Sequence, residues 1–571
     1  MQSSVAYRGH HSLRLIYSHD LTSDQMTSRQ IINFTPQRLG LLALTGLMAL
    51  PILAIFAALF TQTDVSWARL FTTTLPTYII NTGALMVMVA ILAGSMGVTT
   101  AWAVASCEFP GRKLLSWLLI LPLAAPAYII AYVYTDLMEY YGPLQSGLRS
   151  LFGWGGSDYS FPNIRNLPGA ALMLSLVLYP YVYLLARTAF LSQSQGQWQA
   201  ARSLGLSPRR AFFRVSLPAA RPAIAGGLAL VLMETLADFG VADFFAVSTF
   251  STGIFRAWLA EGNRPAAMKL AAFMLLIVIL LVTLEAMSRR GRTSSKGANS
   301  TPAARMTLSK PLAALTTLLC ALPVVFGFII PVSRLTVLAL TSGDNQSQST
   351  FAGYAFNSFT TAAIVALIVT LISISLAYMQ RNSSERFIKA SIKLSTLGYA
   401  LPGAMLAIGL LYPLGAFDQI LTRFAKAHLA WSGGLILTGT SIALIYALAI
   451  RFLTVSFNSV TSGFAAIPPS IDSAARSLGA SPKNVVRRIH APLLKSSLIA
   501  GAILVFIDVM RELPATLILR PFNFETLATR VYWLANDERL AEASTAALLI
   551  ILIGVIPIIW LNRMAAKNER K

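Results

Sequence analysis

The chain has 571 residues, of which 55% are hydrophobic and only 12% are charged, and its mean hydropathy is +0.64. Soluble domains carry roughly 25% charged residues, so a soluble globular chain and a disordered chain are both excluded. The net charge of +22 would suggest nucleic-acid binding in a soluble protein. In a membrane protein the same excess of Lys and Arg is typical of cytoplasmic loops. The two cysteines have no metal-type spacing and indicate neither a disulfide framework nor a zinc site.

Apolar runs of about 20 residues match the hydrocarbon thickness of a bilayer. Six such runs lie in the first half of the chain, at 39–60, 78–105, 114–134, 169–191, 223–245 and 266–287. Six more lie in the second half, at 311–333, 355–379, 391–413, 434–456, 497–519 and 544–562. The sequence therefore predicts an all-α polytopic membrane protein with about 12 transmembrane helices.

The stretch between the two sets of runs, residues 288–310, is rich in Ser, Arg and Gly and contains no acid, which predicts a flexible cytoplasmic linker. The expected organisation is a cytoplasmic N-terminal tail (1–38), a first six-helix domain (39–287), this linker, a second six-helix domain (311–562) and a cytoplasmic C-terminal tail (563–571). His10, His11 and His19 in the N-terminal tail lack the regular spacing of metal ligands, so a plain tail is favoured there.

Basic residues gather in alternate loops, and the loops between them carry more acids. The basic loops include Arg112, Lys113, Arg209, Arg210, Arg214, Arg386, Arg487 and Arg488. The positive-inside rule therefore places these loops and both termini in the cytoplasm. On the outer side, residues 139–143 and Trp154 fit either an interfacial aromatic belt or a surface for a binding protein.

The two largest inside loops share a hexapeptide. Ala-Ala-Arg-Ser-Leu-Gly occupies 200–205 and recurs at 474–479, an offset of 274 residues. The same offset maps Ser207-Pro208 onto Ser481-Pro482, Pro218 onto Pro492, Glu234 onto Asp508 and Asp238 onto Glu512. One period contains six spans, an even number, so both copies face the same side of the membrane and the repeat is parallel.

Each repeated loop has the pattern of two short helices. Gly205 and Gly479 are expected to adopt the left-handed conformation that ends the first helix. A serine and a proline then begin the second helix, and Pro218 and Pro492 are expected to follow its end. The paired alanines leave a low helix surface that suits a partner's groove. A helix-turn-helix DNA reader has a similar pattern, but the flanking membrane spans argue against nucleic acid.

These loops resemble a motif of the permease subunits of bacterial binding-protein-dependent ABC importers. That motif is Glu-Ala-Ala, three residues, Gly, nine residues and Ile-x-Leu-Pro. The matching positions are Gln199, Ala200, Ala201, Gly205 and Pro218 in the first copy and Ser473, Ala474, Ala475, Gly479 and Pro492 in the second. The leading Glu of the motif is replaced by Gln199 and Ser473, although Asp472 stands beside the latter.

The resemblance implies a type I ABC importer permease fold in the bacterial cytoplasmic (inner) membrane, as a multi-pass protein. It also implies two copies of an ABC ATPase subunit that grip segments 199–218 and 473–492 on the cytoplasmic face, and a periplasmic substrate-binding protein on the other. The sequence has no Gly-x-x-x-x-Gly-Lys-Ser/Thr phosphate-binding loop. The chain is therefore expected to hydrolyse no ATP and to bind no cofactor itself.

The cargo is suggested by a narrower resemblance. A fused twelve-span permease is similar to the ferric-iron importers, and the stretches 508–517 and 528–532 resemble that branch. Thiamine and phosphonate importers share the fused architecture, so those cargoes stay open. A proton-coupled secondary transporter is an alternative of another class, but it would leave the duplicated loops without a role.

Acidic residues inside predicted spans form a second candidate site. Glu234 with Asp238, and Asp508 with Glu512, are spaced i, i+4, so each pair is expected on one helix face. An ionised carboxylate in hydrocarbon costs at least ~2.5 kcal/mol, so the pairs should face the bundle interior. They are expected either to flank a path for a hard cation such as Fe³⁺ or to form structural pairs, with Arg511 as a partner. No metal ligand set is assigned.

Overall fold

The computed structural model describes residues 36–60, 71–193, 201, 203–289, 305–343, 348–383, 385–428, 434–481 and 484–568. Within these ranges the regular structure is helical apart from two short parallel strands, β1 (Cys107–Glu108) and β2 (Met306–Thr307). Ten helices in the described part of the chain are long and apolar enough to cross a membrane. Two more helix pairs, bent by 92° and 75°, raise the number to as many as 12. The predicted fold class is confirmed.

The first half contains α1 (Pro36–Ala58), α3 (Leu75–Ser106), α4 (Arg112–Leu118), the 3-10 turn η1 (Leu121–Ala124), α5 (Ala127–Met138), α6 (Pro143–Phe152) and α7 (Leu167–Leu191). It continues with α9 (Pro208–Ala211), the π-helical turn η2 (Phe212–Ser216), α10 (Leu217–Ala237), α11 (Gly240–Phe244), α12 (Phe250–Phe255), the π-helical turn η3 (Arg256–Ala260) and α13 (Arg264–Arg289).

The second half begins with α14 (Lys310–Val324), η4 (Val325–Ile329), α15 (Ile330–Thr341), α16 (Gln348–Asn382), α17 (Arg386–Ser395), η5 (Gly398–Ala400), α18 (Gly403–His428) and α19 (Ser441–Ala465). It ends with α20 (Pro469–Ser477), η6 (Val485–His490), α22 (Ala491–Leu493), α23 (Lys495–Met510), α24 (Pro514–Leu519), α25 (Leu527–Asn536) and α26 (Leu540–Asn568). The offset of 274 residues maps both ends of α7 onto the ends of α19.

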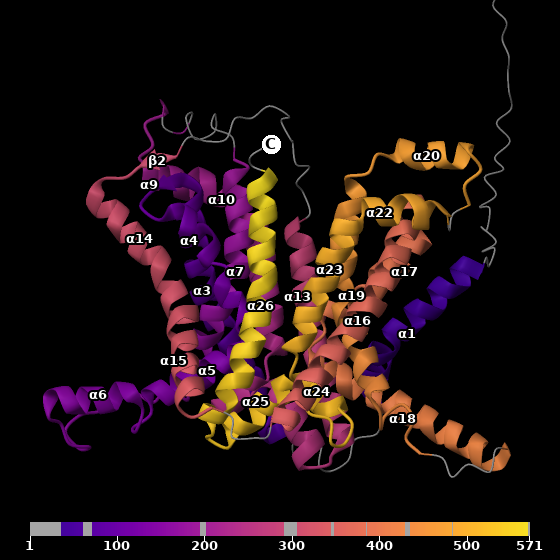
Figure 1. Cartoon of the computed structure of the whole chain (residues 1–571), viewed down its shortest axis with the longest axis horizontal. Helices are drawn as coiled ribbons and strands as arrows, with labels where there is room; N and C mark the ends of the chain where they lie inside the picture. The colour runs from indigo at the N-terminus through magenta and orange to yellow at the C-terminus, as the bar shows by residue number, and fades with distance from the viewer. Residues whose placement is uncertain are drawn as a thin grey trace, which may run out of the picture.

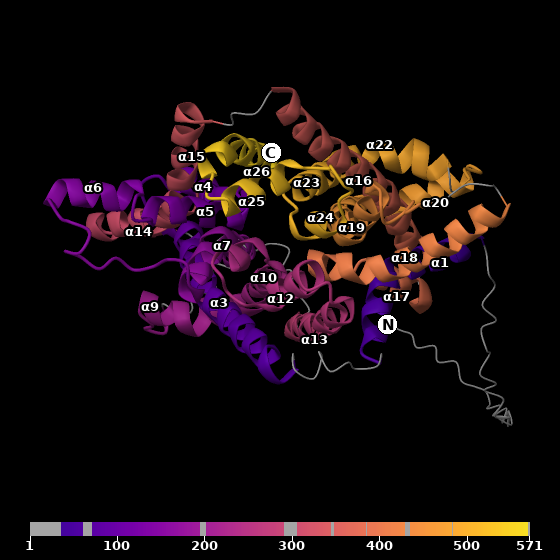
Figure 2. The same ribbon diagram turned by 90° about the horizontal axis from the view of Figure 1, so that it is seen from below.

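The opening helix of each half packs on the other half (Figures 1 and 2). Helix α1 lies against α17 and α18, while α14 lies against α3 and α4, and α15 against α5. Arg334 of α15 pairs with Asp136 of α5 at 2.6 Å, and the hydroxyl of Tyr134 donates to the carbonyl oxygen of Phe326 at 2.6 Å. This packing of the opening helix of each half on the other half ties the two halves together at their edges. It leaves a seam between their centres.

Four predicted spans are broken, and the breaks recur at equivalent places in the two repeats. The runs 114–134 and 391–413 divide before α5 and α18, and the runs 223–245 and 497–519 divide after α10 and α23. Prolines explain three of the breaks, since Pro126, Pro402 and Pro514 lack an amide donor and stand where a new helix begins. Irregular backbone at membrane depth is stable only when it is enclosed by protein or lines a cavity.

Candidate functional site

A cavity of about 130 Å³ lies on the seam, where the broken spans of the two halves meet. All five residues predicted for a translocation path line it: Glu234, Asp238, Asp508, Arg511 and Glu512. The cavity is also lined by Arg451 and by three tyrosines that the sequence analysis missed, Tyr128, Tyr181 and Tyr399. Arg451 could have been found from the sequence, because it is a lone charge in the apolar run 434–456. The tyrosines could not.

Glu234 and Asp508 lie within α10 and α23, but Asp238 and Glu512 stand at the helix breaks, so the prediction that each i, i+4 pair shares one helix face was wrong. Asp238 follows the end of α10 in an extended conformation, with φ −66° and ψ 132°, and Glu512 follows the end of α23. Each carboxylate bridges to the next short helix. Asp238 Oδ2 accepts a hydrogen bond from the amide of Ala242 at 3.1 Å, and Glu512 Oε2 accepts one from Thr516 at 3.0 Å. A carboxylate at a helix N-terminus satisfies amides that have no partner within the helix.

Glu512 is a structural residue of the cavity wall. Its Oε1 accepts from Arg451 Nη1 at 3.0 Å and from the amide of Ala515 at 2.9 Å. Its Oε2 also accepts from the hydroxyl of Thr516 at 2.9 Å. Arg511 does not pair with Glu512. It donates to Asp508 at 2.5 Å and to the carbonyl oxygen of Leu123, across the seam, at 2.8 Å.

Among the described residues, Glu234 and Asp238 have fewer hydrogen-bond partners than Glu512. Glu234 Oε1 accepts from the hydroxyl of Tyr399, across the seam, at 3.1 Å. The hydroxyl of Tyr128 has no partner among the residues that the structure describes. The lining has four carboxylates and two guanidinium groups, so it has two excess negative charges when all six are ionised. An oxygen-rich cavity with more carboxylates than guanidinium groups suits a cation.

The repeated loops lie at the opposite end of the molecule from α6 and α25 (Figure 1). Gln199 and Ala200 fall outside the described residues. Gly205 and Gly479 have φ values of +81° and +79°, which confirms the predicted left-handed turns. Ala201 and Ala475 are buried, whereas Ser473 and Ala474 are exposed. Leu204 and Leu478, which stand next to the glycines, are more than four-fifths exposed in both copies.

The two prolines of the motif behave differently. The prediction that Pro218 follows a helix end was wrong, because α9, η2 and α10 run on as one helix from Arg209 to Ala237. The π-helical turn η2 ends two residues before Pro218 and accommodates its missing amide. Pro492 does stand close to a helix end, since α22 ends one residue later and the chain bends by 75° into α23.

A buried cluster fixes the second loop to the bundle. Asp472 of α20 pairs with Arg381 of α16 at 2.6 Å (Nε to Oδ2) and with His490 of η6 at 2.5 Å (Nε2 to Oδ1). Arg381 also donates to the carbonyl oxygens of Phe464, Ile467 and Pro468, at the end of α19, at 2.7 to 3.2 Å. Because Asp472 is buried and used internally, it cannot stand in for the missing motif Glu as a contact with a partner.

Two fused helical bundles with paired loops at one end and a charged cavity on their seam define a membrane transport protein. The chain belongs to the family of binding-protein-dependent transport system inner membrane components, whose model matches residues 95–292 and 390–571. It is therefore a multi-pass inner-membrane permease subunit of an ABC importer. The family implies ATPase and binding-protein partners, and its members are neither catalytic nor cofactor-binding.

Individual relatives differ in how much of the chain they cover. An Fe(3+)-transport system permease protein of Haemophilus influenzae is 26% identical over 493 residues, which is 85% of this chain and 90% of the relative. A molybdenum transport system permease protein of Escherichia coli is 32% identical over 149 residues, 26% of this chain and 62% of the relative. A sulfate transport system permease protein of the same organism is 32% identical over 179 residues, 30% of this chain and 55% of the relative.

Proposed function

We propose that the chain is the permease of an ATP-driven importer for ferric iron that a periplasmic binding protein delivers. The observation that carries the cargo is the acidic, oxygen-rich cavity on the seam. A hard cation is attracted by that lining, whereas sulfate, the anion in the name of one relative, would be repelled by it. The iron-transport relative, which matches most of the chain, supports the same choice.

The proposed topology places both termini and both repeated loops in the cytoplasm and the face with α6, α24 and α25 in the periplasm. The two six-helix domains are 39–287 and 311–562, joined by the cytoplasmic linker 288–310. Two copies of the ATPase subunit bind the loops, one at Gly205 and one around Ala474 and Gly479. The exposed Leu204 and Leu478 supply apolar contacts there.

The proposed mechanism moves the two halves about the seam. Closure of the ATPase subunits on ATP pushes on the repeated loops, and the halves rock between states in which the cavity opens to one side or the other. The bonds across the seam, from Tyr399 to Glu234 and from Arg511 to the Leu123 carbonyl, are the ones that such a motion exchanges. Glu234 and Asp238 then provide carboxylate oxygens to the passing cation.

Thiamine is the second candidate cargo, because an organic cation is attracted by the same acids. A phosphonate carries negative charge and is disfavoured on the grounds that disfavour sulfate. A proton-coupled secondary transporter would use the acids as proton carriers, but family membership argues for ATP as the energy source.

The test is uptake by the reconstituted permease–ATPase complex carrying Glu234→Gln and Asp238→Asn together. Iron uptake should fall at least about tenfold, since one charge-assisted contact contributes ~1.5–3 kcal/mol. Binding-protein-stimulated ATP hydrolysis should persist. The matched control is Glu261→Gln, an exposed acid outside the cavity. Wild-type iron uptake by the double variant at a normal protein level would remove these acids from the path.

A further inference from the structure

The loop between α24 and α25 holds an aromatic side chain almost entirely in the open. Phe522 is 93% exposed, the highest value of any large hydrophobic side chain in the described part of the chain. It stands between Arg520, which follows α24, and Thr526, which caps α25. Burying one phenyl side chain is favourable by roughly 1.5–3 kcal/mol, so this exposure is costly unless a partner covers the ring.

The first repeat has a similar turn, in which the equivalent residue, Phe245, is buried. Thr249 follows Asp238 by 11 residues, whereas the equivalent Thr526 follows Glu512 by 14, so this segment is three residues longer in the second repeat, one of them in α24 and two in the loop. The rest of the turn is duplicated. Ala246 and Asn523 both have a positive φ, 54° and 60°. Asn81 and Asn357 donate to the residue before each capping threonine, at 3.1 and 3.0 Å. The apolar neighbours in the first loop, Phe245 and Val247, are buried.

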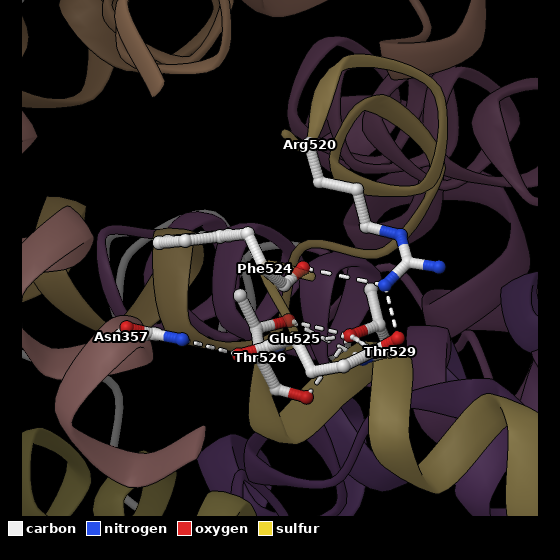
Figure 3. A network of polar contacts seen from close by, with 6 residues as sticks. All are labelled: Asn357, Arg520, Phe524, Glu525, Thr526 and Thr529. Carbon is white, nitrogen blue, oxygen red and sulfur yellow. Dashed lines mark hydrogen bonds and ion pairs between the residues drawn. The ribbon is translucent and has the colours of Figure 1, made fainter. Parts of the chain in front are cut away.

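Polar contacts hold the longer loop in one shape (Figure 3). The Arg520 guanidinium pairs with the Glu525 carboxylate and donates to the carbonyl oxygen of Phe524 at 3.3 Å. Glu525 Oε2 accepts from the hydroxyl of Thr529 at 2.7 Å, and Thr526 and Thr529 form a capping box at the start of α25. A surface side chain on a fixed loop loses little conformational entropy when a partner binds it, which favours affinity.

The loop lies at the end of the cavity wall. Pro514, the first residue of α24, lines the cavity, and the loop follows α24 directly. Helices α24 and α25 lie at the end of the molecule opposite α20 (Figure 1), and near its middle when the molecule is seen from below (Figure 2). In the view of Figure 2, the perimeter, where lipid would contact the protein, includes α1, α6, α14 and the far end of α18.

We propose that Phe522 is the aromatic anchor on which the periplasmic substrate-binding protein docks, and that the three-residue insertion sets the orientation in which that protein sits. Aromatic side chains in pockets carry much of the energy of protein interfaces. Two parallel repeats present nearly equivalent surfaces, so a feature found in one repeat alone discriminates against the reversed orientation. The proposal depends on the proposed topology of the membrane protein and not on iron as the cargo.

The test measures the affinity of the binding protein for the full permease–ATPase complex in lipid nanodiscs, with Phe522→Ser against the wild type. Affinity should fall at least about tenfold, the loss typical of an anchor residue, while ATPase activity without the binding protein stays unchanged. The conservative variant Phe522→Tyr should retain binding. The matched control is Phe60→Ser, which removes another highly exposed ring just beyond perimeter helix α1. Unchanged affinity in Phe522→Ser would overturn the proposal.

A second measurement separates the binding protein from lipid as the partner of this ring. In Phe522→Trp, the fluorescence of the new tryptophan is obtained as the difference between the emission spectra of the variant and the wild type. The binding protein should shift this emission to shorter wavelength. Brominated lipids should not quench it. Quenching by brominated lipid without any response to the binding protein would instead assign the ring to the membrane surface and overturn docking. Neither readout requires iron, so failure here is distinguishable from a wrong cargo.

Discussion

The replacement Asp472→Asn tests whether the buried cluster holds the second repeated loop in place. Asp472 is 5% exposed, and its two oxygens pair with Arg381 and His490 at 2.6 and 2.5 Å. Removing one partner of a buried ion pair costs ~3–5 kcal/mol, because the other charge stays buried without compensation. Arg381 keeps three backbone carbonyl partners. We therefore expect the lower end of that range, about 3 kcal/mol.

The loss is local, so it should appear as easier opening of α20 and not as failure to insert. A change of about 3 kcal/mol corresponds to roughly a hundredfold faster amide exchange in α20, where exchange proceeds by local opening. Hydrogen exchange followed by mass spectrometry measures this directly. Transport per ATP hydrolysed should fall as well, since a loosened loop transmits less of the ATPase motion. The matched control is Ser470→Ala, an exposed residue of α20 outside the motif. Unaltered α20 exchange in Asp472→Asn would refute this role for the cluster.

Three further predictions concern the loops and the cavity wall. Gly205→Trp with Gly479→Trp introduces side chains at φ values of +81° and +79°, which costs ~1–2 kcal/mol of backbone strain at each position. The double variant should insert into the membrane but neither co-purify with the ATPase nor support uptake. Unchanged co-purification would contradict this prediction. Arg451→Leu leaves the Glu512 carboxylate buried without its cation and should lower the melting temperature in detergent by an amount consistent with ~3–5 kcal/mol. The control Arg423→Leu, at an exposed site, should leave the melting temperature unchanged. Equal melting temperatures for the two variants would contradict a stabilising role for the Arg451–Glu512 ion pair. Burial opposes the charged form of Asp472, but Arg381 and His490 outweigh it and lower the pKa of that carboxyl. The protection of α20 amides from exchange should therefore persist from neutral pH down to about pH 4 and disappear in stronger acid. Loss of this protection already between pH 7 and 5 would contradict the prediction.

The duplicated features were predictable because they are written locally in the sequence. Gly205 and Gly479 stand where a repeated sequence pattern ends a helix. Acids inside apolar runs are costly in contact with lipid, so they are expected in the interior of the helix bundle. The helix breaks were missed because a hydropathy run counts apolar residues and ignores where Pro126, Pro402 and Pro514 interrupt the hydrogen-bond ladder.

Other parts of the site depend on tertiary contacts that no local pattern contains. The i, i+4 spacing of Asp508 and Glu512 fits a continuous helix as well as a carboxylate that caps the next helix. Tyr128 and Tyr399 reach the cavity only because the halves pack across the seam, and tyrosine is common in apolar runs. The exchange of α1 and α14 between the halves likewise follows from packing and leaves no periodic signal.

Uptake of radiolabelled ferric iron into proteoliposomes is the most direct measurement of this function. The vesicles hold this chain with its ATPase subunits, the iron-loaded binding protein is added outside, and ATP is enclosed or omitted. Iron should accumulate only with internal ATP and only with the binding protein. Iron entry that ignores ATP and follows a proton gradient would contradict the proposed mechanism. ATP-dependent entry of thiamine without iron would contradict the proposed cargo.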